Sequence, residues 1–210
     1  DWVPLVAGLA ALSLLLGNLM ALVQTNFKRL LAYSTISHVG FLLLGLLSAD
    51  APGYAAAMFY AISYSIMAVA AFGSIILLSR SGFDAGEIDD FRGLWVKNPG
   101  YAFLVLFVIA SLAGIPPCLG FFAKLQVIVA ALQGGYQWLA IWAVVCAVIG
   151  AFYYLKLIRT MFFEKPDSDS VQVNADNHLR AAFAINAAAL LVLGVFSNGI
   201  LAWCIKAFPA

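Results

Sequence analysis

The sequence has 210 residues, of which 64% are apolar and only 10% are charged. A soluble globular domain has about 45–50% apolar residues, so this composition excludes one and indicates a chain that lies mostly in lipid. The formal net charge is +1 and the basic residues are scattered between apolar segments, so nothing indicates a nucleic-acid partner. The three cysteines, Cys118, Cys146 and Cys204, show no disulfide, zinc or haem motif.

Six apolar segments follow one another along the chain, separated by charged, proline or glycine residues. They cover residues 2–24, 31–48, 54–79, 101–133, 136–163 and 181–208. Runs such as Leu42-Leu43-Leu44 lack the alternation of a membrane β-barrel strand, and in hydrocarbon a helix satisfies its own backbone groups. We therefore predict an all-α integral membrane protein with six transmembrane helices. The chain begins with Asp1, without an initiator methionine or a signal peptide, and we interpret it as a fragment or a processed chain.

Lysine and arginine residues favour one side of the membrane. If the first helix runs from the outside to the inside, Lys206 is the only basic residue at an outer end. The inner ends and loops then carry Lys28, Arg29, Arg80, Arg92, Lys97, Lys156, Arg159, Lys165 and Arg180. Because short cytoplasmic loops carry an excess of basic residues, we expect both ends of the chain on the outer side. The polar stretches 80–99 and 164–180 should then face the cytoplasm.

The second predicted helix contains a candidate proton relay. His38 and Ser34 share a face at a spacing of four residues, and a histidine with hydroxyl neighbours is suited to pass protons near neutral pH. The alternative is a buried histidine that simply satisfies its hydrogen bonds. Lys28, at the start of this helix, is either part of the proton path or a marker of the cytoplasmic interface.

Polar residues in three other helices have two interpretations. Ser63, Tyr64 and Ser65 in the third helix either bind water for a proton path or join packed helices. Asn18 in the first helix is ambiguous. In the fifth helix, Tyr153, Tyr154, Lys156 and Arg159 indicate an aromatic belt with basic anchors at the interface.

The fourth segment is too long for one straight helix. Its 33 residues, Tyr101 to Gln133, would make a helix about 50 Å long, whereas the hydrocarbon core is about 30 Å thick. Two prolines remove two backbone donors, so we predict a discontinuity at Gly114, Pro116 and Pro117. A helix broken at membrane depth needs cover from protein or a wet cavity, and such breaks recur at transport sites.

Lys124 is the only charged residue of this fourth segment. An ionisable group inside the membrane costs about 2.5–3.5 kcal/mol on insertion scales, so its presence indicates a function by default. The alternative is a lysine that reaches the interface with its long side chain. No acidic residue lies within any of the six apolar segments, so an acid that switches Lys124 between loading and release has to come from elsewhere.

Two stretches resemble a known family. KRLLAYSTISHVGF, residues 28–41, and SLAGIPPCLGFFAKL, residues 111–125, are similar to the antiporter-like membrane subunits of proton-pumping NADH:quinone oxidoreductase, respiratory complex I. Lysine at position 124 and a chain end directly after the last helix favour the subunit N branch of that family over the M and L branches. The resemblance implies that residues 1–163 form the second five-helix repeat of a fourteen-helix subunit. Residues 164–180 then form a cytoplasmic loop, and residues 181–210 the final transmembrane helix.

The resemblance also implies roles and partners. Lys124 matches the lysine taken to be the terminal proton carrier of the outward half-channel, and His38 matches the histidine of the polar axis that connects half-channels. Subunit M, the small subunit K and the lipid bilayer are the implied partners, in the inner membrane of a bacterium. The chain itself is expected to hold no cofactor, because NADH, FMN, iron–sulfur clusters and quinone belong to other subunits.

Two other readings remain open. The multisubunit cation/proton antiporters share the GIPP-plus-lysine pattern, so the chain is alternatively a subunit of such an antiporter. A purely structural bundle that tethers neighbouring pumps is the third reading, and the lysine beside a broken helix argues against it.

Overall fold

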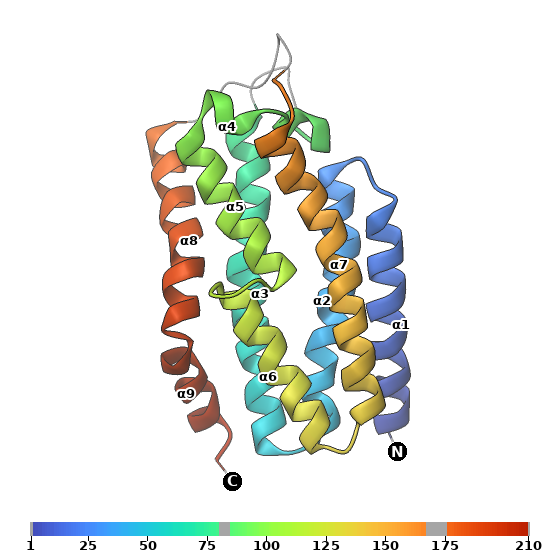
Figure 1. Ribbon diagram of the computed structural model, residues 1–210. Coiled ribbons are helices and arrows are strands. Elements are labelled where there is room, and N and C mark those ends of the chain that lie inside the picture. Colours follow the sequence, from blue (N-terminus) through green and yellow to red (C-terminus); the bar gives the residue numbers. More distant parts are fainter. Residues whose placement is uncertain (1, 80–84, 167–175, 210) are drawn as a thin grey trace.

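The chain folds into a bundle of helices whose long axes are roughly aligned (Figure 1). The computed structural model describes residues 2–79, 85–166 and 176–209. Within these ranges the helices are α1 (Val3–Leu22), α2 (Phe27–Leu47), α3 (Ala51–Leu78), η1 (Ile88–Phe91), α4 (Leu94–Lys97), α5 (Pro99–Ala113), α6 (Leu119–Gln133), α7 (Gln137–Phe163), α8 (Asn177–Val195) and α9 (Ser197–Ala207). The described residues contain no strand, so the prediction of an all-α chain is confirmed.

Five helices, α1, α2, α3, α7 and α8, are long and apolar enough to cross a membrane. α5 and α6 are shorter and together occupy the predicted fourth segment, with α5 ending at Ala113 and α6 beginning at Leu119. The last predicted segment, 181–208, is not one continuous helix, because it divides at Phe196 into the end of α8 and the start of α9. A separate helix begins directly after it, at Ser197.

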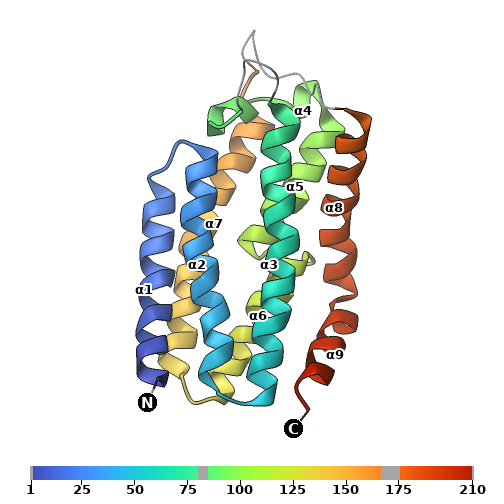
Figure 2. The ribbon, with the colours of Figure 1, turned by 180° about the vertical axis from the view of Figure 1, so that it is seen from behind.

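α3 lies at the centre of the bundle and packs against α2, α5, α6, α8 and α9. α1, α2 and α7 lie together on one side of the bundle, and α5 and α8 lie together on the other side (Figure 2).

The close approach of α1 and α2 depends on two glycines. A Cβ atom at Gly17 would lie 2.5 Å from the backbone nitrogen of Ser37, and one at Gly40 would lie 2.8 Å from Cγ of Leu14.

The two ends of the bundle differ in charge. Both termini lie at one end, and α4 and η1 lie at the other (Figure 1). Most of the described basic residues lie on helix ends and loops at the α4 end: Lys28, Arg29, Arg92, Lys97, Lys156, Arg159, Lys165 and Arg180. Lys206 lies in α9, near the termini. Arg80 and most of the predicted loop 164–180 lie outside the described residues.

The α4 end is held together by polar contacts. The α1–α2 connection pairs with residues 86–88 through backbone bonds from Phe27 to Gly86 and from Ile88 to Thr25. Arg92 forms ion pairs with Asp89 at 3.0 Å and with Glu164 at 3.1 Å. These contacts fix the entrance of α2, from which the chain runs inward to His38.

Candidate functional site: a buried lysine at a helix break and a histidine among tyrosines

The interruption between α5 and α6 leaves backbone groups that need partners. The last four carbonyls and the first four N–H groups of any helix have no partner within that helix. At the end of α5, the N–H of Gly114 donates to Ala110 and Ser111, and the N–H of Ile115 donates to Ala110. Gly114 adopts the left-handed conformation with φ +85°, which is the usual C-terminal stop of a helix.

Lys124 supplies partners for the two remaining carbonyls of α5. Its ammonium group donates to the carbonyl oxygens of Leu112 and Ala113, each at 2.9 Å. The carbonyl end of a helix carries a partial negative charge that stabilises a cation. The break therefore creates a cation site from backbone alone, and among the described residues no carboxylate contacts Lys124.

Ser111 completes the break from the other side. Its hydroxyl oxygen accepts a hydrogen bond from the N–H of Gly120, in the first turn of α6, at 3.0 Å. The two half-helices thus stabilise each other, α5 through Ser111 and α6 through Lys124. Sequence reasoning did not assign a role to Ser111, although it opens the quoted motif.

Lys124 is buried, with only 8% of its surface exposed. Its ammonium nitrogen also lies 5.2 Å from the centre of the Phe41 ring, on α2. The break lies about half-way along the bundle (Figure 1), so the ammonium is far from both ends. The ammonium therefore ends between α2 and α5, inside the bundle.

His38 lies among three tyrosines from two other helices. Its Nδ1 atom is 2.7 Å from the hydroxyl of Tyr60, and its Nε2 atom is 3.5 Å from the hydroxyl of Tyr154. The Tyr64 ring stacks on the imidazole at 4.6 Å. The first contact is a short hydrogen bond and the second is at the limit of one. His38 is buried.

The expected neighbours of His38 differ from the observed ones. Ser34 shares its face, as predicted, but the Ser34 hydroxyl donates to the carbonyl of Leu31 at 2.9 Å. Thr35 also donates to Leu31 and accepts from the Tyr64 hydroxyl at 2.7 Å. The small hydroxyls satisfy their own helix, which short polar side chains commonly do, and phenols from α3 and α7 contact the histidine instead.

The predicted interfacial role of Tyr153 and Tyr154 is wrong. Both tyrosines are buried, and the Tyr153 hydroxyl donates to Oδ1 of Asn18 at 3.0 Å. Asn18 donates in turn to the Ser37 hydroxyl at 2.9 Å. Lys156 and Arg159, a turn further along α7, are exposed, so the interface begins after the tyrosines.

Ser63 is fully buried, and its hydroxyl has no hydrogen-bond partner among the described residues. A Cβ atom at Gly120 would touch the sulfur of Met67, so Met67 faces the first turn of α6. α3 and α6 run in opposite directions (Figure 2), and Ser63 and Lys124 each lie one turn further from that contact. Ser63 is therefore level with Lys124.

Lys28 lies in the first turn of α2 and is half-buried. Ten residues separate it from His38, which corresponds to about 15 Å along the helix. It is therefore not brought into contact with the histidine cluster. The structure places it at the basic end of the bundle.

No direct hydrogen bond joins His38 to Lys124. Phe41 and Tyr60 lie between them, since Phe41 contacts Lys124 and the Tyr60 ring stacks on Phe41 at 6.1 Å. A proton that moves from one to the other therefore requires a mobile carrier such as water.

No group of three or more histidine, cysteine, aspartate or glutamate side chains that could hold a metal occurs in the part of the chain that the structure describes. The residues that sequence reasoning missed, or left without a role, are Ser111, Tyr60, Tyr154 and Asn18. The motif around the break pointed to Ser111, whereas the other three are recognisable only once α1, α3 and α7 are packed against α2.

Comparisons with known proteins agree with the sequence motifs. Residues 1–150 match the family described as NADH:quinone oxidoreductase/Mrp antiporter, TM. The NADH-quinone oxidoreductase subunit N of Xanthomonas euvesicatoria is 55% identical over 208 residues, which are 99% of this chain and 43% of that protein. The chain thus spans less than half the length of this curated relative.

Two solved structures share the fold. A chain of respiratory complex I from Thermus thermophilus with bound aureothin is 32% identical, with a TM-score of 0.83 over 95% of this chain and 45% of that one. A chain of the Mrp complex from Dietzia is 23% identical, with a TM-score of 0.86 over 99% of this chain and 47% of that one. At this identity the second comparison establishes a common fold only.

Proposed function

The chain belongs to the NADH:quinone oxidoreductase/Mrp antiporter membrane family, and on that basis we propose that it is part of a proton-translocating subunit N of an NADH-quinone oxidoreductase. Its relative at 55% identity carries that name. In this proposal the chain moves protons and holds no redox centre. NADH, FMN, iron–sulfur clusters and quinone act in other subunits and drive it from a distance.

The observation that carries the proposal is the setting of Lys124. Its ammonium is buried at mid-bundle and held by two backbone carbonyls, with no carboxylate partner among the described residues. The carbonyls that hold the ammonium are neutral, so no ion pair is broken when the amine releases its proton. A structural salt bridge would have the opposite property.

The proposed path begins at the basic end of the bundle, near Lys28. It passes Ser34 and reaches His38 with its partners Tyr60 and Tyr64, and a water bound by Ser63 carries the proton on to Lys124. Tyr60 is well placed to fix the imidazole, because its hydroxyl lies 2.7 Å from Nδ1. This order follows the described contacts and the direction of α2.

The arrangement in the membrane is part of the same proposal. α5 and α6 together make one discontinuous span, broken at Gly114, Pro116 and Pro117, so that the bundle has six spans with α8 and α9 as the last. Residues 1–163 form a second antiporter-like repeat, and both termini face the periplasm of a bacterial inner membrane. Subunits M and K are the proposed neighbours.

Proton pumping with Lys124→Ala tests the proposal, with Lys156→Ala as a matched control because Lys156 is an exposed lysine on α7. Both variants are made in the intact complex and reconstituted in vesicles. We expect fewer protons per electron for Lys124→Ala and an unchanged ratio for Lys156→Ala. An unchanged ratio in both would remove Lys124 from the path.

The second candidate is a subunit of a multisubunit cation/proton antiporter. It is favoured by the family description, which includes the Mrp antiporters, and by the shared fold of the Dietzia chain. Sodium-dependent proton exchange in vesicles without a quinone reductase would support this candidate. Proton movement that requires NADH and quinone would exclude it.

A further inference from the structure

A groove runs along the outside of the helix break, between α6 and α7. It has a volume of about 430 Å³ and is lined mainly by aliphatic side chains, among them Ile115, Leu125, Ile128, Val144 and Val148. Gly114 and Lys124, at the break, belong to its lining. Among the described residues, Lys124 is the one charged side chain that lines it.

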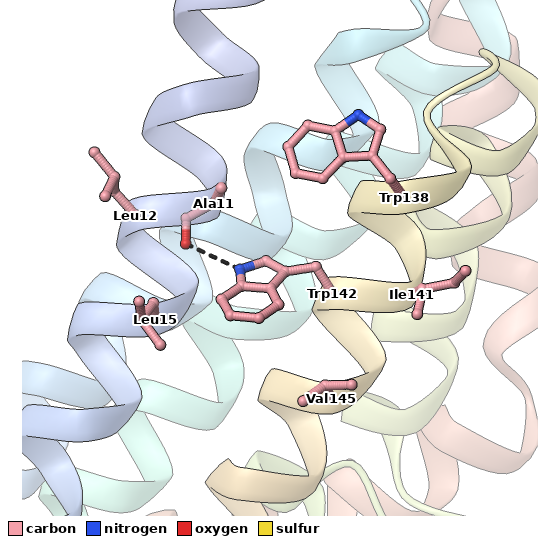
Figure 3. A pocket seen from close by; sticks show the side chains of 7 residues that line it. All are labelled: Ala11, Leu12, Leu15, Trp138, Ile141, Trp142 and Val145. Atoms are coloured by element: carbon pink, nitrogen blue, oxygen red, sulfur yellow. Dashed lines mark hydrogen bonds between the residues drawn. The ribbon is translucent and has the colours of Figure 1, made fainter.

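A second groove of the same size provides a comparison. It lies between α1 and α7 and has a volume of about 420 Å³. Figure 3 shows its lining: Ala11, Leu12, Leu15, Trp138, Ile141, Trp142 and Val145. Its polar side-chain groups are the indole N–H groups of Trp138 and Trp142, and that of Trp142 donates to the carbonyl of Ala11 at 3.2 Å. Both grooves accept an apolar chain, but only the α6–α7 groove offers an ionisable group to a ligand.

The ammonium of Lys124 has capacity for one more acceptor. Lysine has three N–H donors, and two of them bind the carbonyls of Leu112 and Ala113. A charge-assisted hydrogen bond to a carboxylate is about twice as strong as a neutral one. The groove therefore combines an apolar channel with a buried cation that lacks an acidic partner among the described residues.

We propose that the α6–α7 groove binds a long-chain fatty acid, with its carboxylate on Lys124 and its hydrocarbon tail along α6 and α7. Burial of the tail contributes little in the membrane, because lipid is also apolar. The ion pair with Lys124 therefore decides which amphiphile the groove selects.

Membrane depth favours a fatty acid over a phospholipid. Lys124 lies half-way along the bundle, and a charged group at that depth is costly. A carboxylic acid enters as the neutral RCOOH. Once Lys124 has released its proton, as the proposed function requires, the acid transfers its own proton to the lysine amine, which gives RCOO⁻ and RNH₃⁺. The O–H bond breaks, an N–H bond forms, and the net charge of the site does not change. A phosphodiester headgroup stays charged and cannot enter in this way.

The proposal rests on the proposed function, because the acid binds at a Lys124 that has released its proton. If Lys124 carries protons, an occupied groove holds it protonated and stops that step. The binding test therefore uses photolabelling instead of pumping, so that its failure and the failure of the proposed function are separate results.

The experiment uses the intact complex in membranes and a hexadecanoic acid with a photoreactive diazirine in mid-chain. We expect labelled residues on α6 and α7 around the groove, with competition by dodecanoic acid but not by its methyl ester or by dodecyl sulfonate. Lys124→Ala should reduce this labelling about tenfold, which corresponds to loss of one charge-assisted hydrogen bond.

Two variants keep the test decisive if Lys124→Ala fails to assemble. Val148 and Val145 are both exposed residues of α7, and they lie about one turn apart. Val148→Trp fills the α6–α7 groove, whereas Val145→Trp fills the α1–α7 groove. Only Val148→Trp should abolish the labelling. Equal labelling of all lipid-facing helices, equal competition by the methyl ester, or the same result for both tryptophan variants would overturn the proposal.

Discussion

Gly114 lies directly against the side chain of Lys124. A Cβ atom at Gly114 would stand 2.9 Å from Cδ and 3.2 Å from Nζ of the lysine. The same glycine has φ +85°, a conformation that L-residues avoid. One residue thus both ends α5 and makes room for the ammonium that satisfies the last carbonyls of that helix.

Gly114→Ala is predicted to damage the site beyond its backbone strain. The strain alone costs about 1–2 kcal/mol, and the new methyl group displaces Lys124 from Leu112 and Ala113. Gly135→Ala is the matched control, because Gly135 has the same φ of +85° and open space at the Cβ position. Thermal unfolding and proton pumping are measured for both. Equal loss of pumping in the two variants would contradict this account.

The hydrogen bond between Tyr60 and His38 is predicted to matter more than the stacking contact of Tyr64. Tyr60→Phe leaves Nδ1 of a buried histidine without a partner, which costs about 1–3 kcal/mol, and should slow proton transfer. Tyr64→Phe keeps the ring that stacks on His38 and removes only the bond to Thr35. Pumping rates of the two variants check this order, and a larger defect in Tyr64→Phe would reverse it.

Ser63→Ala is predicted to slow proton transfer without loss of stability. Its hydroxyl has no partner among the described residues, so its removal breaks no described hydrogen bond, yet it takes away the proposed water ligand. Ser74→Ala is the control on the same helix, since the equally buried Ser74 donates to Ala71 at 2.6 Å. Slower pumping in Ser74→Ala than in Ser63→Ala would argue against a water at Ser63.

Asp50 provides a prediction on pH outside the membrane-spanning segments. It caps α3 by accepting from the N–H of Gly53 at 2.8 Å, and the Ser48 hydroxyl donates to it at 2.6 Å. The Ser48 hydroxyl, and then the Gly53 N–H, lower the pKa of the Asp50 carboxyl from 3.8. The pKa of Asp50 is therefore lower in the folded protein than in the unfolded chain. Because of this difference, the cap stabilises α3 fully when the pH is above the pKa of the unfolded chain, and this stabilisation is lost as the pH falls through the pKa of the folded protein.

Hydrogen exchange in the first turn of α3 measures this cap. Asp50→Ala should cost about 1 kcal/mol of local stability at pH 7 and raise the exchange rate there. Asp50→Asn keeps an acceptor and should exchange slowly at pH 7 and at pH 3, after correction for the intrinsic pH dependence. Identical exchange in all three proteins would show that the cap contributes nothing.

The helix break and its lysine could be predicted from the sequence because both signals are local. Two prolines cannot continue a helix, and one charge in 33 apolar and neutral residues stands out. The partners of His38 could not be predicted from the sequence. Tyr60 and Tyr154 lie in apolar helices, and the residues next to a tyrosine in such a helix are the same whether its ring faces lipid, the interface or the core.

The two wrong predictions have physical causes. Tyr153 and Tyr154 precede two basic residues, a pattern typical of an interface, but α7 continues to Phe163, and both rings are buried against Asn18 and His38. The last segment divides at Phe196 although it contains no proline in its middle. Hydropathy does not detect this division, because the residues on both sides of Phe196 are apolar enough to continue one segment.

The central claim is that Lys124 releases and takes up a proton, and Lys124→Arg tests it most directly. Arginine keeps the positive charge and can donate to the carbonyls of Leu112 and Ala113, but a guanidinium does not lose its proton in proteins. The measurement is the number of protons pumped per electron by the intact complex, with assembly confirmed for the variant. The account predicts a complex that assembles and pumps fewer protons per electron. A Lys124→Arg complex that pumps the full number would contradict it, because the lysine would then serve only to cap α5.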